Sequence, residues 1–245
     1  MITVALLTRN DERRIGRTLE SLEWADEVLL IDTGSTDHTV EIAATFPNVK
    51  VHHEPFSGYG QLRQKGARLA SHDWIFSIES DEVMSEALAV ELQELTKDPA
   101  CVYSVPRQNY FNNKWIKCCG WHPDRQVRLS HRSHSAKQQV ALEGPLLHYP
   151  FTSIAEMIDK IQYDSDLFAI EYHHRKKGSI LRAHLLGFWH FWKHYLFKGG
   201  LFAGAEGYII CRYLGHRALY KMLKLRQVNL DLPPMGEPPY YDADV

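Results

Sequence analysis

Residues 74–85 read Trp74-Ile75-Phe76-Ser77-Ile78-Glu79-Ser80-Asp81-Glu82-Val83-Met84-Ser85. The apolar start predicts a short buried strand, and Ser85 is a typical residue to cap the helix that follows. The carboxylates of Glu79, Asp81 and Glu82 repel one another at a strand end unless a cation or hydrogen bonds offset the repulsion. We interpret them as a divalent-metal site that holds a phosphate. The alternative is a solvated turn whose acids favour the N-terminus of the next helix.

Three further apolar runs precede this one and alternate with helical patterns. The expected strands cover residues 2–7, 28–31 and 49–52, so that residues 1–82 read β-α-β-α-β-α-β. Right-handed crossovers turn such a series into a parallel sheet covered by helices. The expected fold class is therefore α/β with a mostly parallel central sheet.

The second of these strands ends in the turn Asp32-Thr33-Gly34-Ser35-Thr36-Asp37. Gly34 permits tight backbone geometry, and Asp32 lies at a strand tip, where it can accept hydrogen bonds from a ribose or a base edge. The chain has no G-x-G-x-x-G after its first strand and no G-x-x-x-x-G-K-[ST]. This argues against a dehydrogenase or P-loop fold. A bound nucleotide would be held by strand-tip acids and a metal.

Charge is unevenly distributed along the 245 residues. Residues 1–100 hold 9 Lys and Arg against 18 Asp and Glu, residues 101–226 hold 19 against 8, and residues 227–245 add four acids and no base. The basic part suggests an anionic partner such as a phosphorylated lipid, a membrane surface or nucleic acid. A solvated basic face is the alternative.

The segment 120–129 combines aromatic, acidic and basic side chains. Trp121 offers a face on which a sugar can stack, and the guanidinium of Arg128 can bind a phosphate in two places. The preceding residues 109–116 resemble a hairpin with an Asn-Asn turn. The segment is therefore interpreted as a binding surface. The alternative is a surface hairpin with a structural tryptophan.

From residue 151 the pattern becomes helical. Leu185, Trp189, Trp192 and Leu196 form one stripe in the segment 180–214, which basic residues interrupt. These interruptions exclude a membrane-spanning helix, which needs about 20 predominantly apolar residues. An interfacial helix on anionic lipid fits the pattern. The alternative is a helix packed on the domain or in a dimer interface.

The order of these motifs resembles glycosyltransferase family two. The resemblance rests first on the strand ends and turns in residues 4–10, 24–39 and 73–82. More closely, the chain resembles the lipopolysaccharide-core glucosyltransferases of the WaaE/KdtX type. Residues 110–111, 120–129, 147–149 and 160–163 extend the match to about residue 170. No single motif is decisive, but their order and spacing are specific.

This resemblance implies a GT-A fold, a UDP-sugar donor, Mg²⁺ or Mn²⁺, and inversion at the anomeric carbon. It implies an inner-core heptose of lipopolysaccharide as acceptor, at the cytoplasmic face of the inner membrane. Carried over residue by residue, it gives the following expectations. Thr8, Asn10 and Asp32 line the uridine site, Arg63 approaches the diphosphate, Glu79 touches the sugar or ribose, Asp81 binds the metal, and Trp121, Arg128 and His148 face the acceptor.

The sequence departs from the family pattern in two places. The first acid of the metal element is Glu79, where the family usually has aspartate. The family's His-Glu pair is missing from residues 137–144, which read Lys-Gln-Gln-Val-Ala-Leu-Glu-Gly. An inverting displacement needs a carboxylate to take the proton of the acceptor hydroxyl. Glu143 and Asp124 are the candidates for this base.

The expected function is thus transfer of a hexose, with glucose as the expected sugar, from a UDP-sugar to lipopolysaccharide core or another lipid-linked glycan. The alternatives are a catalytically degenerate domain with a binding or assembly role, and a polyprenyl-phosphate glycosyltransferase. Nothing matches a nucleic-acid-binding module. The N-terminus lacks a signal-peptide pattern, which favours a cytoplasmic, peripheral membrane protein. The expected organisation is a catalytic domain at 1–150 (nucleotide half 1–85, acceptor half 86–150), a helical extension at 151–228 and a disordered tail at 229–245.

Overall fold

The computed structural model describes residues 1–133 and 137–230 of the chain. Contacts divide the chain into two units, of which the first comprises residues 1–108 and 123–150. The second comprises residues 109–122 and the chain from Phe151 onward. Each unit has an apolar cluster of its own. The hairpin region 109–122 therefore packs with the helices that follow Phe151. The tail expected from residue 229 lies, beyond Leu230, outside the described residues.

The first unit begins with alternating strands and helices. They are β1 (Thr3–Thr8), α1 (Ile15–Glu20), β2 (Glu27–Asp32), α2 (Thr39–Ala43), β3 (Val49–His53), α3 (Tyr59–Leu69) and β4 (Trp74–Glu79). The predicted β-α series over residues 1–82 and the α/β fold class are confirmed.

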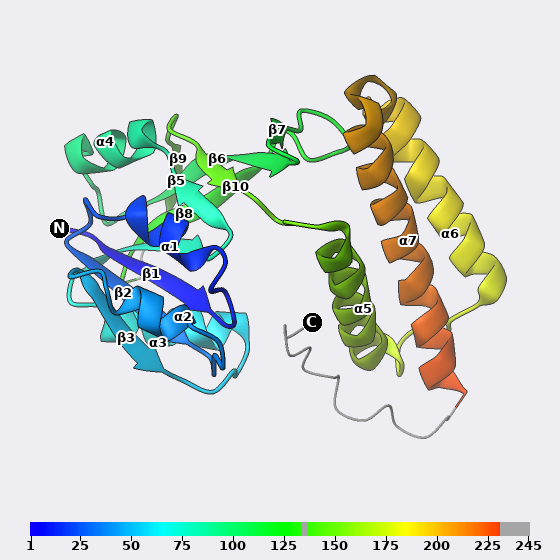
Figure 1. Ribbon diagram of the computed structural model, residues 1–245, viewed down its shortest axis with the longest axis horizontal. Helices are drawn as coiled ribbons and strands as arrows, with labels where there is room; N and C mark the ends of the chain where they lie inside the picture. Colours follow the sequence, from blue (N-terminus) through cyan, green and yellow to red (C-terminus); the bar gives the residue numbers. More distant parts are fainter. Residues whose placement is uncertain (134–136, 231–245) are drawn as a thin grey trace. The chain divides into compact units, whose positions relative to one another are not determined.

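The four strands pair in parallel in the order β3-β2-β1-β4. Figure 1 labels the first three of them, β3, β2 and β1, as neighbours. The chain extends the sheet from β1 outward to β3, and then crosses back to add β4 on the other side of β1. The carboxyl ends of β1 and β4 therefore flank the point where the strand order reverses. Ligands of open α/β sheets bind in the crevice at such a point. The acids that follow β4 thus lie next to the end of β1.

Helices cover both faces of the parallel strands. All six residues of β2 are buried, as expected for a strand covered on both sides. Val28 and Leu30 belong to the cluster that includes the apolar face of α1. Leu29 and Ile31 pack instead with Leu62 of α3. Because successive side chains of a strand point to opposite faces, α1 and α3 lie on opposite sides of the sheet.

The remaining strands of the first unit make the sheet mixed. They are β5 (Glu82–Met84), β6 (Cys101–Phe111), β8 (Arg125–His131), β9 (Gln138–Ala141) and β10 (Leu146–His148), and the last three residues of β6 belong to the second unit. β8 pairs antiparallel with β4 and β6, β10 pairs antiparallel with β5, and β9 pairs parallel with β6. The helix α4 (Glu86–Glu94) begins at Ser85, whose hydroxyl accepts the N–H of Leu88 at 3.2 Å. This bond confirms the predicted cap.

The second unit is mainly helical, which confirms the predicted C-terminal helical extension. Its helices are α5 (Ile154–Tyr172), α6 (Ile180–Trp192), the π-helical turn η1 (Lys193–Phe197), the 3₁₀ turn η2 (Gly200–Ala203) and α7 (Gly204–Asn229). α7 packs against both α5 and α6 (Figure 1). A Cβ atom on Gly215 of α7 would lie 3.0 Å from the carbonyl oxygen of Gly187 on α6, so small residues allow the close approach. Among the described helices, none combines the length and apolar character needed to cross a bilayer.

A short hairpin is attached to these helices. It joins β6 to β7 (Lys114–Trp115) through Asn112 and Asn113, whose φ angles are 49° and 58°. A two-residue turn of this type needs positive φ at both positions, which asparagine tolerates. The predicted Asn-Asn hairpin is confirmed. Phe111 and Ile116 pack in the apolar cluster that contains residues of α5 and α7.

The buried carboxylate of Glu27 ties three segments of the first unit together. It accepts hydrogen bonds from the Thr3 hydroxyl at 2.6 Å, the Lys50 ammonium at 2.7 Å, and the Ser71 hydroxyl and N–H at 2.6 and 2.8 Å. Burial by itself raises the pKa of this carboxyl. The donors outweigh burial and lower the pKa from 4.5 to about 2.

This arrangement predicts an acid-sensitive contribution to stability. Because the pKa of Glu27 is lowered by folding, the contribution is fully present above pH 4.5 and is lost as the pH falls toward 2. A difference of this size corresponds to about 3 kcal/mol. We expect Glu27→Gln to remove most of the contribution at neutral pH and to cost little near pH 2. Urea unfolding of both proteins across this range measures the difference. A cost that does not change with pH would contradict the assignment.

Candidate active site

The carboxyl ends of β1, β2 and β4 lie side by side at one edge of the parallel sheet. Thr8 is the register partner of Asp32 on the neighbouring strand, and Leu7 is the partner of Glu79. Three of the residues predicted for the site, Thr8, Asp32 and Glu79, therefore come from separate parts of the sequence to one edge. The first unit thus has polar side chains at the position where its topology predicts a ligand.

Asp32 organises the turn that follows β2. Its carboxylate accepts the N–H of Gly34 at 3.3 Å, the N–H of Ser35 at 3.1 Å and the Ser35 hydroxyl. The ring of His53, at the end of β3, lies 3.0 Å away through Nδ1. A carboxylate offers about four lone-pair sites, and these bonds use most of them. Asp32 is also almost fully buried. In this state it shapes the turn, and a nucleoside would have to exchange with one of these partners.

Asn10 links the end of β1 to the same turn. Its N–H donates to the Ser35 hydroxyl at 3.0 Å, and its side-chain oxygen accepts the N–H of Thr36 at 2.8 Å. Its φ is 51°, in the left-handed region that asparagine adopts more readily than most residues. Thr8, two residues earlier, donates its hydroxyl to Asp11 at 2.9 Å. Thr8, Asn10 and the turn after β2 therefore form one connected polar group.

Asp81 follows β4 and contacts His148 at the end of β10. The Asp81 Oδ2 atom lies 3.3 Å from the Nε2 atom of His148. Its other oxygen, Oδ1, is buried and has no hydrogen-bond partner among the described residues. Burial by itself raises the pKa of the Asp81 carboxyl. The hydrogen bond and charge of His148 outweigh burial, with help from Arg14 and Arg107, and the pKa lies below its ordinary value of 3.8. Asp81 is therefore an ionised carboxylate with one buried, unsatisfied oxygen.

Glu82 is fully buried and forms an ion pair with Arg128. The other guanidinium nitrogen of Arg128 lies 3.2 Å from Glu79, so that one arginine bridges two acids. Burial raises the pKa of Glu82, and the neighbouring carboxylates of Glu79 and Asp81 also raise it. Arg128 acts in the opposite direction, but the pKa remains above its ordinary value. Two of the three acids in residues 79–82 are thus held by arginine.

The same network extends at both ends. Arg63 of α3 lies 3.4 Å from Glu79, and Arg107 of β6 lies 3.4 Å from Glu82. Arg107 also donates its Nε–H to Asp124 at 2.7 Å, and Asp124 accepts a second bond from the side chain of Gln126 at 2.8 Å. The chain of charges brings together the predicted residues Arg63, Glu79, Arg128 and Asp124, although they come from three elements of the fold and the loop before β8.

Glu143 lies elsewhere in the first unit. Its N–H and that of Gly144 donate to the carboxylate of Glu91 on α4, and its own side chain is exposed. Glu143 precedes β10 at the end where Leu146 pairs with Met84, whereas His148 is at the other end. The structure therefore places Glu143 at the end of β10 that faces away from His148.

Trp121 belongs to the second unit. Its ring centroid lies 6.4 Å from that of Phe151, and its carbonyl oxygen accepts the side-chain N–H of Asn109 at 2.8 Å. It packs in the apolar cluster that contains residues of α5 and α7. Trp121 therefore packs within its own unit, and its role in facing the acceptor stays a prediction.

Two polar residues of the site were not anticipated from the sequence. Asp11 lies between the ends of β1 and β4, because it contacts Thr8 and its carboxyl is hydrogen-bonded to Ser80. Burial raises the pKa of Asp11, although Ser80 and Arg14 act against it. An acid just after the first strand was visible in the sequence, but its contact with the segment after β4 was not. Nothing in the sequence pattern indicated that Arg107 belongs to the site, because it lies in the middle of a strand.

The donor set limits how a cation could bind. Within the described residues, no cluster of three histidine, cysteine or acidic side chains has the arrangement of a metal site. Glu79 and Glu82 are paired with arginines, which leaves Asp81 and His148. Mg²⁺ is commonly held by one or two carboxylates together with substrate phosphates and water. Asp81, with its unsatisfied oxygen, fits a cation of this kind, in which a phosphate supplies the other ligands.

Comparison with known proteins shows which sequences this chain is similar to. The model of the family described as "Glycosyl transferase family 2" matches residues 3–145. An uncharacterized glycosyltransferase of Rickettsia bellii is 24% identical over 261 residues, which cover 95% of this chain and 88% of that protein. The lipopolysaccharide core biosynthesis glycosyltransferase LpsC of Rhizobium meliloti is 30% identical over 115 residues, 44% of this chain and 43% of LpsC.

Among solved structures, the chain was compared with S. aureus TarS, residues 1–349, in complex with UDP-GlcNAc. It is 14% identical, with a TM-score of 0.49, and the match covers 94% of this chain and 90% of the TarS chain.

Proposed function

Because this chain belongs to glycosyl transferase family 2, we propose that it moves a hexose, glucose by expectation, from a UDP-sugar to an inner-core heptose of lipopolysaccharide or another lipid-linked glycan. The observation that carries the proposal is the ionised carboxylate of Asp81 beside the topological switch point, with one buried oxygen that lacks a partner. Such an oxygen is costly unless a ligand satisfies it. The GT-A fold expected from the sequence agrees with the parallel strands that position it.

In this proposal the donor binds across the ends of the parallel strands. The turn organised by Asp32 and Asn10 would receive the uridine, and Arg63 would approach the diphosphate. A divalent cation, held by Asp81 and His148, would neutralise charge that develops on the departing diphosphate. Glu79 would touch the sugar or ribose, because its side chain is 44% exposed and only one of its oxygens is paired with arginine.

Asp124 is the stronger candidate for the base. It is part of the charge network that contains Glu79 and Glu82, whereas Glu143 lies at the far end of β10. Arg107 would hold the Asp124 carboxylate in place. Arg128 is buried in its ion pairs, so its proposed part in acceptor binding would be to position Glu79 and Glu82. His148, beside Asp81, would lie where donor and acceptor meet.

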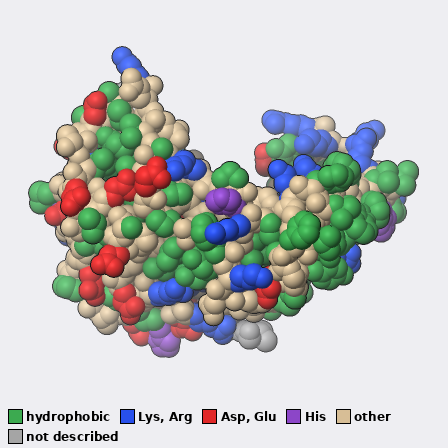
Figure 2. All heavy atoms as spheres, turned by 90° about the horizontal axis from the view of Figure 1, so that it is seen from above, with side chains coloured by type: hydrophobic (Ala, Val, Ile, Leu, Met, Phe, Trp, Pro, Cys, Tyr) green, Lys and Arg blue, Asp and Glu red, His purple; other side chains and the backbone are tan. Residues whose placement is uncertain are grey.

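The acceptor class is supported by a relative and by a surface. LpsC is a lipopolysaccharide core biosynthesis enzyme by name, and it shares the part of the chain aligned with it. In the second unit, α6 carries an apolar ridge on its exposed side, which consists of Leu181, Leu185, Phe188 and Trp189. Hydrophobic side chains gather over the helices of this unit, with lysines and arginines beside them (Figure 2). A lipid-linked acceptor would be met by a peripheral protein at the cytoplasmic face of the inner membrane.

The proposal is tested by release of UDP. We expect the purified protein with Mn²⁺ to release UDP from one member of a UDP-sugar panel, and faster when a heptose-containing core acceptor is added. Asp124→Asn should lower the rate by about two orders of magnitude or more, since a general base contributes roughly 10² to 10⁴. Glu143→Gln should leave the rate within about twofold, because its exposed side chain lies at the far end of β10.

The results of these assays distinguish the candidate bases and the candidate functions. A large loss in Glu143→Gln with an active Asp124→Asn would reverse the assignment of the base. If the sugar is transferred only to a polyprenyl phosphate, the protein is a polyprenyl-phosphate glycosyltransferase. UDP binding without UDP release, with every donor and acceptor, would favour the binding or assembly role. The exposed Gln138 and Gln139 of β9, in the region that lacks the His-Glu pair, are the observation that keeps this last alternative open.

A further inference from the structure

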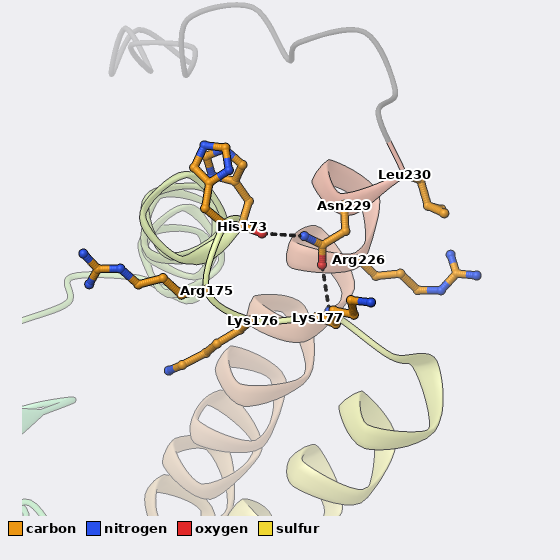
Figure 3. A pocket seen from close by; sticks show the side chains of 9 residues that line it. His173, Arg175, Lys176, Lys177, Arg226, Asn229 and Leu230 are labelled. Atoms are coloured by element: carbon orange, nitrogen blue, oxygen red, sulfur yellow. Dashed lines mark hydrogen bonds between the residues drawn. The ribbon is translucent and has the colours of Figure 1, made fainter.

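The second unit contains a cavity of about 500 Å³, and none of the proposed catalytic residues is among those that line it. It is lined by the loop 173–178, which leads from the end of α5 into α6, and by the end of α7 (Figure 3). The cationic residues that line it are Arg175, Lys176 and Lys177 of the loop and Arg226 of α7, and two histidines precede them. Among residues 1–133 and 137–230, no acidic side chain lines the cavity. Its electrostatic character is therefore that of an anion site.

Asn229, the last residue of α7, holds the loop in place. Its side-chain N–H donates to the carbonyl oxygen of His173 at 2.9 Å, and its side-chain oxygen accepts the N–H of Gly178 at 2.9 Å (Figure 3). Gly178 packs so closely on α7 that a Cβ atom there would lie 2.1 Å from the backbone nitrogen of Arg226. Both ends of the loop are thus fixed to one helix, and the cations are presented from an organised backbone.

Within the part of the chain that the structure describes, few partners compensate the charges of the cavity. No ion pair among the described residues involves Arg175, Lys177 or Arg226. Lys176 lies over the ring of Tyr172, 4.0 Å from its centroid. Cations near a helix C-terminus interact favourably with the helix dipole, and two helices end at this cavity. That effect is confined to the last turn, however, and Arg175 and Lys177 lie beyond the end of α5 at Tyr172. The dipoles therefore do not explain a concave site with four cations.

The apolar ridge of α6 begins next to this cavity. α6 starts at Ile180, two residues after Gly178, and its first exposed apolar side chains are Ile180 and Leu181, the latter 70% exposed. The ridge continues along the helix to Phe188, which is 67% exposed. A surface with an apolar ridge and adjoining cations matches a bilayer with anionic headgroups, in which acyl chains and phosphates lie at different depths.

We propose that this cavity binds a phosphate monoester, carried by the headgroup of an anionic lipid. The inference deepens the proposed location at a membrane surface and rests on it. Arginine guanidiniums bind two phosphate oxygens at once, and lysines add compact positive charge, so that several cations together suit a dianion. The neighbouring ridge favours a lipid as the source, because a free phosphate gains nothing from exposed leucine and phenylalanine side chains.

Vesicle binding of the full chain tests the proposal. The vesicles contain phosphatidylcholine with a minor fraction of phosphatidic acid, whose headgroup is a phosphate monoester. We expect Lys177→Ala/Arg226→Ala to partition about 30-fold more weakly than the wild type, the loss expected for two cations at an anionic surface. The matched control is Arg68→Ala/Lys137→Ala, which removes the same charge from exposed positions of the first unit and should bind as the wild type.

A second variant tests the organisation of the site. Asn229→Ala removes both bonds to the loop and leaves every cation in place, so we expect a weaker loss, several-fold, that depends on phosphatidic acid. A parallel experiment with inorganic phosphate tests whether the cavity binds free phosphate instead of a lipid headgroup. If it raises the melting temperature of the wild type but not of Lys177→Ala/Arg226→Ala, and vesicle binding is equal in both, the source is a free phosphate and the lipid assignment is overturned.

Other outcomes also overturn it. If the control variant loses vesicle binding equally, the attraction depends only on the net charge of the protein. If Lys177→Ala/Arg226→Ala binds vesicles as the wild type does, the cavity does not take part in membrane binding. Displacement of the vesicles by single-stranded RNA, dependent on the same two residues, would assign the site to nucleic acid. Turnover of UDP-sugar with a soluble core acceptor should be the same in the wild type and in Lys177→Ala/Arg226→Ala. A chain that lacks turnover but binds phosphatidic acid through this cavity would refute the proposed function and leave this inference standing.

Discussion

The Asp81→Asn variant should lose sugar transfer by roughly 100- to 1000-fold, the cost of removing one strong electrostatic contact to developing charge. Asparagine preserves the shape of the side chain and removes its negative charge. The carboxylate that would bind the cation is ionised at neutral pH, since its pKa lies below the ordinary value. A neutral amide is a weak ligand for a hard divalent cation. The loss should therefore appear in the chemical step and in Mn²⁺-dependent UDP binding together.

Calorimetry of UDP with and without Mn²⁺, beside a UDP-release assay, measures both effects. Glu20→Gln is the matched control, because it neutralises an exposed acid of α1 in the same unit. It should behave as the wild type in both assays. If Asp81→Asn binds UDP with the same dependence on Mn²⁺ as the wild type, Asp81 does not hold the cation, and the site must be sought at other acids. Asp11, with its contact to Ser80, would then be the next residue to replace.

The largest effect on stability is expected from Glu82→Ala. The substitution leaves Arg128, which is 5% exposed, without its buried partner. Removing one member of a buried ion pair typically costs about 3 to 5 kcal/mol, because the remaining charge is desolvated and uncompensated. It also removes the acceptor for the backbone N–H of Glu79, which donates to Glu82 at 3.1 Å. We expect the melting temperature to fall by roughly 10 °C.

Glu79→Ala provides the matched comparison. It removes an acid from the same arginine, but the side chain of Glu79 is partly exposed, so the expected cost is below about 1 kcal/mol. Replacing Glu82 and Arg128 together by leucines should recover part of the stability lost in Glu82→Ala, since it removes the stranded charge. Thermal unfolding followed by circular dichroism measures all three variants. Equal losses in Glu79→Ala and Glu82→Ala would mean that burial does not determine the importance of the two acids.

Much of the site could be predicted because strand ends are visible in the sequence. Apolar runs that stop at Thr8, Asp32 and Glu79 mark the carboxyl ends of β1, β2 and β4, and parallel pairing brings such ends to one edge. The same reasoning cannot show which of several acids close together in the sequence is free to bind a ligand. Asp81 has an unsatisfied oxygen, whereas Glu82 is paired with an arginine 46 residues further along the chain. Sequence spacing carries no information about such a partner.

The candidates for the base illustrate the same limit. Asp124 and Glu143 are both acids in segments of irregular pattern, and nothing local distinguishes them. The antiparallel pairing of β10 with β5 directs Glu143 away from His148, and Arg107 connects Asp124 to Glu82. The position of Trp121 is a second example. Its segment was interpreted as a binding surface, and nothing in its local pattern showed that residues 109–122 make their apolar contacts with the helical unit.

The sequence by itself determined the α/β series, the parallel pairing of its first strands, the family and the helical extension. These depend on local periodicity and on the handedness of crossovers, which act over short stretches of chain. Only the tertiary structure decided which acids are paired, which oxygen of Asp81 lacks a partner, and that a cationic cavity forms where α5 and α7 end. These features depend on burial and on charges from distant segments, whose interaction energy is set by their separation and environment in the folded chain.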